Sequence, residues 1–85
     1  MLSAIMNLYI KVWCPWCIDA VSWLEQHGFE FSTLDVLADE AAFQRMRKIS
    51  GQSKTPTLEL DNGVVLADFD TKQLEKFLKQ HNMFG

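Results

Sequence analysis

The stretch LYIKVWCPWC, residues 8–17, decides the fold. Residues 8–13 are rich in aromatic and β-branched side chains, which is typical of a β-strand. Pro15 follows Cys14, and proline suits the first turn of a helix because its missing N–H group would have no partner there. From Trp16 onward the apolar residues recur with helical spacing. We therefore predict a strand and a helix with two cysteines at their junction.

The first half of the chain continues with alternating helical and extended patterns. The inward stripe of the first helix, spaced i, i+3, i+4 and i+7, consists of Cys17, Ala20, Val21 and Leu24. Gly28 ends this helix. A second strand is predicted over residues 29–36. A second helix follows over residues 39–49, with acids at its start and bases near its end, as the helix dipole favours.

The second half predicts a hairpin and a last helix. Short strands over residues 57–60 and 64–67 flank Asp61-Asn62-Gly63, and Asn-Gly suits the positive φ angles of a type I′ turn. Asp70 or Thr71 can cap the last helix, whose inward stripe is Leu74, Phe77, Leu78 and His81.

The element order is therefore β-α-β-α-β-β-α, within one domain over residues 1–85. Strands joined through a helix should be parallel and the final hairpin antiparallel. We expect an α/β fold with a four-stranded mixed sheet flanked by three helices.

Composition narrows the function classes. Eleven acids and eight bases are mixed along the 85 residues, giving a net charge of −3 with no basic block, so a nucleic-acid partner is not indicated. No run approaches the roughly 20 apolar residues of a membrane span. Residues 1–7 lack the basic start of an export signal. We expect a monomeric cytoplasmic protein without nucleic-acid or membrane partners.

The two cysteines are predicted to have different roles in thiol–disulfide exchange. Cys14 stands at a helix N-terminus, where unpaired N–H groups favour a thiolate and lower a cysteine pKa from about 8.5 to about 3.5–7.5. Only the thiolate attacks disulfides. Cys17 lies one turn later on the inward stripe, where burial raises its pKa. Cys14 is therefore predicted to attack and Cys17 to resolve, and Lys11 supplies a cation for the thiolate or for an anionic substrate group.

Two other roles for the cysteine pair, a structural disulfide and a zinc site, fit the sequence less well. A structural disulfide is disfavoured in a reducing compartment. A zinc site needs about four ligands, and the chain has no second cysteine pair, while His27 and His81 are typical of surface or packed residues. No metal site is predicted. Trp16, expected to be partly exposed beside the thiol, suggests a contact surface for substrate.

On these residues the chain, from Leu8 onward, resembles the glutaredoxin family of the thioredoxin superfamily. Residues 14–17 are similar to the family motif Cys-Pro-Tyr-Cys with Trp for Tyr, and Lys11 stands where the family carries a basic residue. Ser50-Gly51 followed by Thr55-Pro56 resembles the family segment Ser-Gly…Val-Pro. The resemblance implies that Pro56 is cis and faces the active disulfide, and that the backbone of Thr55 pairs with the cysteinyl part of glutathione.

One stretch departs from the family pattern. The family usually carries two glycines before the last helix, and Ala67 and Asp68 replace them here. Asp70 and Thr71 still offer side-chain oxygens and helix N–H groups for the γ-glutamyl end of glutathione, although helix capping explains them equally well. Asp68 adds bulk and negative charge where the anionic end of glutathione would pass.

The resemblance implies a thioredoxin-like (glutaredoxin) fold and a glutathione-dependent thiol–disulfide oxidoreductase. Its substrates would be protein disulfides or glutathione mixed disulfides, with glutathione as co-substrate and no permanently bound cofactor. Two alternatives stay open. One is a redoxin reduced by thioredoxin reductase, such as those that serve ribonucleotide reductase. The other is an iron–sulfur cluster carrier that uses Cys14 and glutathione, although a proline after the first cysteine resembles the catalytic forms more.

Overall fold

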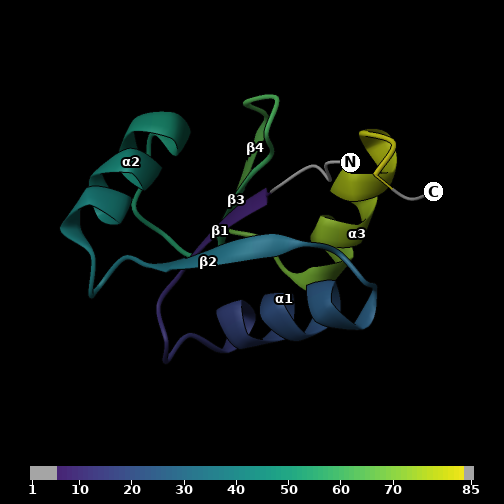
Figure 1. The fold of residues 1–85 in the computed structure, drawn as a ribbon, viewed down its shortest axis with the longest axis horizontal. Helices are drawn as coiled ribbons and strands as arrows, with labels where there is room; N and C mark the ends of the chain where they lie inside the picture. Colours follow the sequence, from purple (N-terminus) through teal and green to yellow (C-terminus); the bar gives the residue numbers. More distant parts are fainter. Residues whose placement is uncertain (1–5, 84–85) are drawn as a thin grey trace.

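Seven elements follow one another along residues 6–83, the part of the chain that the computed structural model describes (Figure 1). They are β1 (Met6–Ile10), α1 (Pro15–Gln26), β2 (Phe31–Asp35), α2 (Glu40–Ser50), β3 (Thr57–Glu59), β4 (Val65–Ala67) and α3 (Thr71–Gln80). This is the predicted order. Residues 1–5 and 84–85, the ends of the predicted domain, lie outside the described residues, as does most of the N-terminal segment considered above.

The four strands form one mixed sheet in the order β2-β1-β3-β4. Strand β1 pairs in parallel with β2 and antiparallel with β3, and β3 and β4 form the antiparallel hairpin. The mixed sheet was predicted. Because β1 is a central strand, the segment that follows Ile10 leaves the sheet between the ends of β2 and β3.

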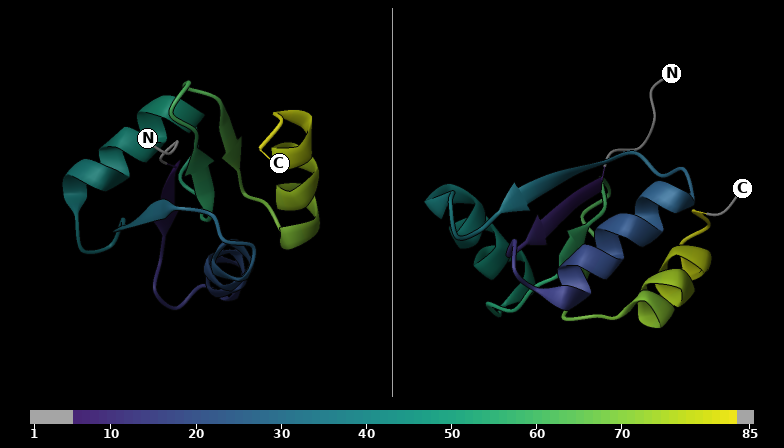
Figure 2. Two further views of the ribbon diagram at one scale, coloured as in Figure 1. Left: turned by 45° about the vertical axis from the view of Figure 1, so that its right-hand side comes forward. Right: turned by 90° about the horizontal axis from the view of Figure 1, so that it is seen from below.

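Helices cover both faces of the sheet (Figure 2). On one face α1 and α3 pack against β1 and β3, and the buried residues of this cluster are Met6, Leu8, Ala20, Leu24, Leu58, Leu60, Phe69, Leu74, Phe77 and Leu78. On the other face α2 packs over a smaller cluster of Tyr9, Val36, Ala42 and Met46. None of the helices within residues 6–83 is long and apolar enough to cross a membrane.

Three local details differ from the prediction. Strand β1 ends at Ile10 rather than residue 13, because the chain turns there and the Cys14 N–H donates to the Lys11 carbonyl at 3.0 Å. The hairpin is not a type I′ turn: Gly63 has a positive φ of 89° but Asn62 does not, which is typical of a three-residue loop. His81 caps the C-terminus of α3 rather than extending its buried stripe.

A buried carboxylate connects α2 to the sheet. Glu59 on β3 is 8% exposed and accepts hydrogen bonds from the Tyr9 hydroxyl at 2.8 Å, from Arg45 Nη2 at 2.7 Å and from Asn7 Nδ2 at 3.3 Å. Burial opposes ionisation of Glu59, but the bonds from Arg45, Tyr9 and Asn7 outweigh it and lower the pKa of Glu59. Burial and then Glu59 raise the pKa of Tyr9 to about 12.

We predict that Glu59→Gln lowers the free energy of unfolding by about 1–3 kcal/mol at pH 7, because charge-assisted hydrogen bonds become neutral ones. A carboxylate whose folded pKa is lowered contributes stability above its ordinary value near 4.5, and that contribution disappears as the pH falls through the folded value. Urea denaturation from pH 7 to pH 3 should therefore show the difference from wild type closing on acidification. A difference independent of pH would contradict this account, and Glu25→Gln, at an exposed position on α1, is the matched control.

Candidate active site

Cys14 caps the N-terminus of α1 with its sulfur. The residue has an extended backbone, with φ −81° and ψ 119°, and Sγ accepts the Cys17 N–H at 3.4 Å. The helix begins at Pro15, as its tolerance for a first-turn position predicts. The sulfur thus occupies the place that a Ser or Asp oxygen takes in an ordinary N-cap. A negative charge on Sγ is stabilised there by N–H groups that have no partner within the helix.

The surroundings separate the two thiols electrostatically. Both cysteines are free and buried, with Cys14 4% exposed and Cys17 1% exposed. Burial opposes ionisation of Cys14, but hydrogen bonds from the Cys17 side chain and N–H, the Thr55 side chain and the Trp16 N–H together lower its pKa. Burial and then the hydrogen bond with the Cys14 sulfur raise the pKa of Cys17 to about 11. Cys14 is therefore the thiol that ionises first.

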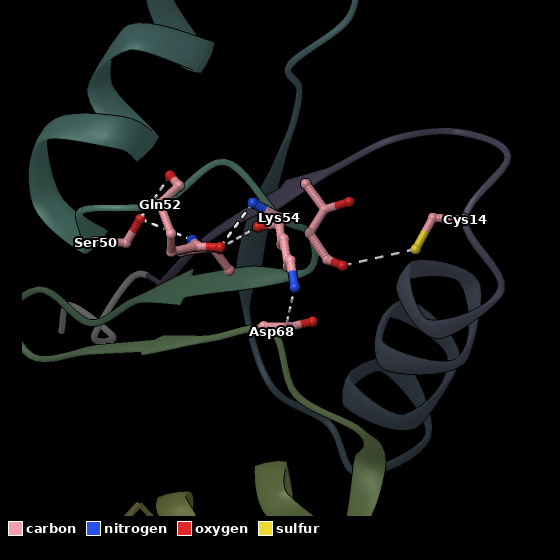
Figure 3. Close-up of polar contacts among 7 residues, drawn as sticks. Cys14, Ser50, Gln52, Lys54 and Asp68 are labelled. Atoms are coloured by element: carbon pink, nitrogen blue, oxygen red, sulfur yellow. Dashed lines mark hydrogen bonds and ion pairs between the residues drawn. The ribbon is translucent and has the colours of Figure 1, made fainter.

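The segment before β3 closes the site on the opposite side of the sulfur. The Thr55–Pro56 peptide bond is cis, as the resemblance implies. The Cys14 thiol donates to the Thr55 carbonyl, with 3.8 Å between sulfur and oxygen (Figure 3). Thr55 is 9% exposed and Pro56 is fully buried. The structure thus brings Thr55 against the predicted nucleophile, and Pro56 follows it through the cis peptide bond.

A surface groove of about 210 Å³ leads to the Cys14 sulfur, and its lining residues are Lys11, Trp13, Cys14, Trp16, Lys54, Thr55 and Asp68. Trp13 and Trp16 are 65% and 58% exposed, so both indole rings are available for contact. The Lys11 ammonium group lies 5.8 Å from the centre of the Trp13 ring, within reach of a cation–π interaction. Lys11 therefore lines the same groove as the sulfur, and the carbonyl of the same residue accepts the Cys14 N–H.

Asp68 occupies a position whose backbone suits glycine. Its φ is +55°, in the left-handed region that glycine adopts freely and that Asp tolerates better than most residues. The Asp68 N–H donates to the Pro56 carbonyl at 2.9 Å, which ties the segment after β4 to the cis peptide. Asp68 Oδ2 lies 3.9 Å from Lys54 Nζ, so this carboxylate has a cationic partner at the rim of the groove. Sequence reasoning missed Lys54, which no motif marks.

The two residues predicted for the γ-glutamyl end of glutathione begin α3. Asp70 Oδ1 accepts the Gln73 N–H at 2.8 Å, and Gln73 Oε1 accepts the Asp70 N–H at 2.9 Å, so these residues form a capping box. Thr71 is the first residue of the helix. Asp70 also lines a depression of about 240 Å³ together with Trp16, Asp68, Phe69 and Gln73. This depression adjoins the groove at Cys14, because both contain Trp16 and Asp68.

Comparisons with known proteins agree with this arrangement. The family model described as Glutaredoxin matches residues 7–65. A curated relative, the uncharacterized glutaredoxin-like 8.6 kDa protein in the rubredoxin operon of Clostridium pasteurianum, is 24% identical over 75 residues, covering 88% of this chain and 99% of the relative.

Solved structures give the same result for the fold. A mutant of the thioredoxin-like protein BC3987 is 28% identical with a TM-score of 0.78, covering 87% of this chain and 94% of that one. The glutaredoxin grx-1 of Archaeoglobus fulgidus is 18% identical with a TM-score of 0.73, covering 86% of this chain and 84% of that one. The described residues therefore have a thioredoxin-like fold, with a four-stranded mixed sheet and three helices.

Proposed function

The chain belongs to the glutaredoxin family, and from this premise we propose that it is a dithiol thiol–disulfide oxidoreductase with Cys14 as nucleophile and Cys17 as resolving thiol. The observation that carries this proposal is the Cys14 sulfur at the N-cap of α1, 3.4 Å from the N–H of the buried Cys17. The directions of the pKa shifts, lower for Cys14 and higher for Cys17, agree with this geometry. Cys14 at the helix N-terminus can attack as a thiolate, and Cys17 stays protonated on the buried side of the helix.

The reaction consists of two exchanges. The Cys14 thiolate attacks one sulfur of a substrate disulfide, a mixed disulfide forms, and the other substrate sulfur leaves as a thiolate that takes a proton from water. Cys17 then loses its proton and attacks Cys14 Sγ, which releases the remaining substrate sulfur as a thiolate. The Cys14–Cys17 dithiol has passed two electrons to the substrate and is now a disulfide.

The timing of the second exchange follows from what raises the pKa of Cys17. Burial is the largest cause, but the hydrogen bond and the charge of the Cys14 sulfur also contribute. Once Cys14 is bonded in a mixed disulfide it carries no negative charge, so that part of the increase disappears. Cys17 therefore ionises more readily after the first exchange than before it.

The surface around the thiol favours disulfides carried on polypeptides. Within the described residues, four of the most exposed large hydrophobic side chains lie within four positions of Cys14; they are Val12, Trp13, Trp16 and Ile18, between 57% and 65% exposed. Exposed apolar groups that cluster beside a reactive atom are typical of a contact surface. A protein disulfide can bury these side chains more fully than a small molecule can.

Glutathione is the proposed reductant that restores the dithiol, with no resident cofactor. Two glutathione thiols would donate the electrons and leave as glutathione disulfide. Lys11, Trp16 and Thr55 support this role because they line the groove at the sulfur, and Pro56 follows Thr55 through a cis peptide bond. At the start of α3, Asp70 and Thr71 would hold the γ-glutamyl end. A monomer in the reducing cytoplasm suits such chemistry.

A second candidate keeps the chemistry and replaces glutathione by thioredoxin reductase. The ion pair between Lys54 and Asp68 at the rim of the groove favours this second candidate. Asp68 places a carboxylate beside the path to the sulfur, and its partner Lys54 is a cation that could otherwise bind a glutathione carboxylate. At 3.9 Å, with side chains 73% and 57% exposed, the pair is weak and separable. Asp68 therefore weakens the site for an anionic tripeptide without blocking it.

We predict that Cys14→Ser abolishes the reduction of all disulfides, because a hydroxyl at the helix N-terminus is not ionised at neutral pH. Cys17→Ser should keep turnover on glutathione mixed disulfides, which need only one cysteine, and lose turnover on protein disulfides. Steady-state assays on the two substrate classes check both expectations. Turnover that persists in Cys14→Ser would refute the assignment.

The reductant is tested by two coupled NADPH assays on one small disulfide, one with glutathione and glutathione reductase, the other with thioredoxin reductase alone. We expect turnover with glutathione, increased about five- to tenfold in kcat/KM by Asp68→Gly, since one nearby like charge is removed. Lys76→Gly, on an exposed face of α3, is the control. Turnover with thioredoxin reductase alone would instead establish the second candidate.

A further inference from the structure

Residues 51–56 connect α2 to β3 and carry the threonine that contacts Cys14 (Figure 3). Helix α2 ends at Gly51, whose φ of +71° turns the chain out of the helix. The segment forms neither helix nor strand over these residues. Backbone bonds fix its two ends, from the Gly51 N–H to the Arg47 carbonyl and from the Asp68 N–H to the Pro56 carbonyl. Between these ends the described side-chain contacts centre on Gln52.

The oxygen and the nitrogen of the Gln52 side-chain amide both form hydrogen bonds to residues in or next to its own loop. Its Oε1 accepts the Lys54 N–H at 2.6 Å. Its Nε2 donates to Ser50 Oγ at 2.8 Å and to Thr57 Oγ1 at 3.1 Å. One side chain thus joins the end of α2, the middle of the loop and the first residue of β3.

The direction of these bonds is determined by the two hydroxyls. Ser50 donates its single proton to the Met46 carbonyl at 2.6 Å, with the Gln52 carbonyl as a longer alternative at 3.3 Å. Thr57 donates its proton to the Lys54 carbonyl at 2.8 Å. Both hydroxyl oxygens can therefore only accept from position 52. The position requires one acceptor and two donors, which an amide provides and a carboxylate does not.

The loop in turn determines what faces the nucleophile. Lys54 extends from it toward Asp68, and the next residue, Thr55, places its carbonyl 3.8 Å from Cys14 Sγ. Burial raises the pKa of both thiols, and the Thr55 side chain is among the contacts that lower it. The charged groups around the sulfur in this groove are Lys11, Lys54 and Asp68, two of them held by or paired to the same loop.

We propose that Gln52 is a positioning residue: its amide holds residues 52–57 so that Thr55 stays against the Cys14 sulfur. This inference rests on the proposed function, since the position of Thr55 affects catalysis only if Cys14 is the nucleophile. It concerns a residue that touches neither sulfur and acts through Thr55.

The test measures iodoacetamide alkylation of Cys14 as a function of pH, with modified Cys14 identified by mass spectrometry. Gln52→Ala and Gln52→Glu should each shift the profile to higher pH and slow alkylation about threefold on its acidic limb, because they weaken the hydrogen bond from the Thr55 side chain that lowers the pKa of Cys14. The rate at high pH should not change. Gln44→Ala is the matched control, because Gln44 is an exposed residue of α2 that bonds to Glu40 on the same helix.

Two further variants separate positioning from plain stability. Thr55→Val removes the hydroxyl and leaves the Thr55 carbonyl in place. The double variant Gln52→Ala with Thr55→Val should be no slower than Thr55→Val alone, because both changes act on the contact of the Thr55 side chain with the Cys14 sulfur. Ser50→Ala, which removes one acceptor of the amide, should shift the profile in the same direction by less and serves if the Gln52 variants do not fold.

Additive effects would overturn the inference, as would an unchanged alkylation profile in Gln52 variants whose urea midpoint falls. A different result would contradict the proposed function: a wild-type protein whose Cys14 is alkylated readily but which reduces no disulfide with any reductant. The two failures are therefore distinguishable.

Discussion

The contact between the Cys17 N–H and the Cys14 sulfur, 3.4 Å long, is the interaction on which the rest of the structure depends. It exists because the first helix starts immediately after the turn that follows β1, so the sulfur caps the helix. An N-cap oxygen would only satisfy N–H groups, whereas an N-cap sulfur is also made acidic by them. The same helical turn buries Cys17. A nucleophile and a protonated resolving thiol thus arise from one local geometry.

The elements around this junction place a second wall against the sulfur. Because β1 and β3 are neighbours in the sheet, the segment entering β3 arrives beside the segment leaving β1. The cis Thr55–Pro56 peptide closes the site there. Two polar networks support this wall: Glu59 fixes α2 to the sheet, and Gln52 orders the loop that follows α2. Neither Glu59 nor Gln52 lines the groove at Cys14, and we propose that Gln52 acts on it through Thr55.

The sequence was sufficient for the element order, the mixed sheet and the position of the two cysteines at the start of α1, because these follow from local periodicity and proline placement. The end of β1 was missed because Val12 and Trp13 have strand-like side chains that the structure exposes in a turn. The Glu59 network was missed because its partners on β1 are about 50 residues away in sequence. Gln52 has local partners, but no periodic pattern identifies an amide that bonds within its own loop.

The most direct test of the account is a pH titration of the reduced protein followed by the 13Cβ chemical shift of each cysteine. We predict that Cys14 titrates below the ordinary range of cysteine thiols and that Cys17 stays protonated until the pH approaches about 11. A common midpoint for the two residues, or Cys17 titrating before Cys14, would contradict the division of roles between attacking and resolving thiol.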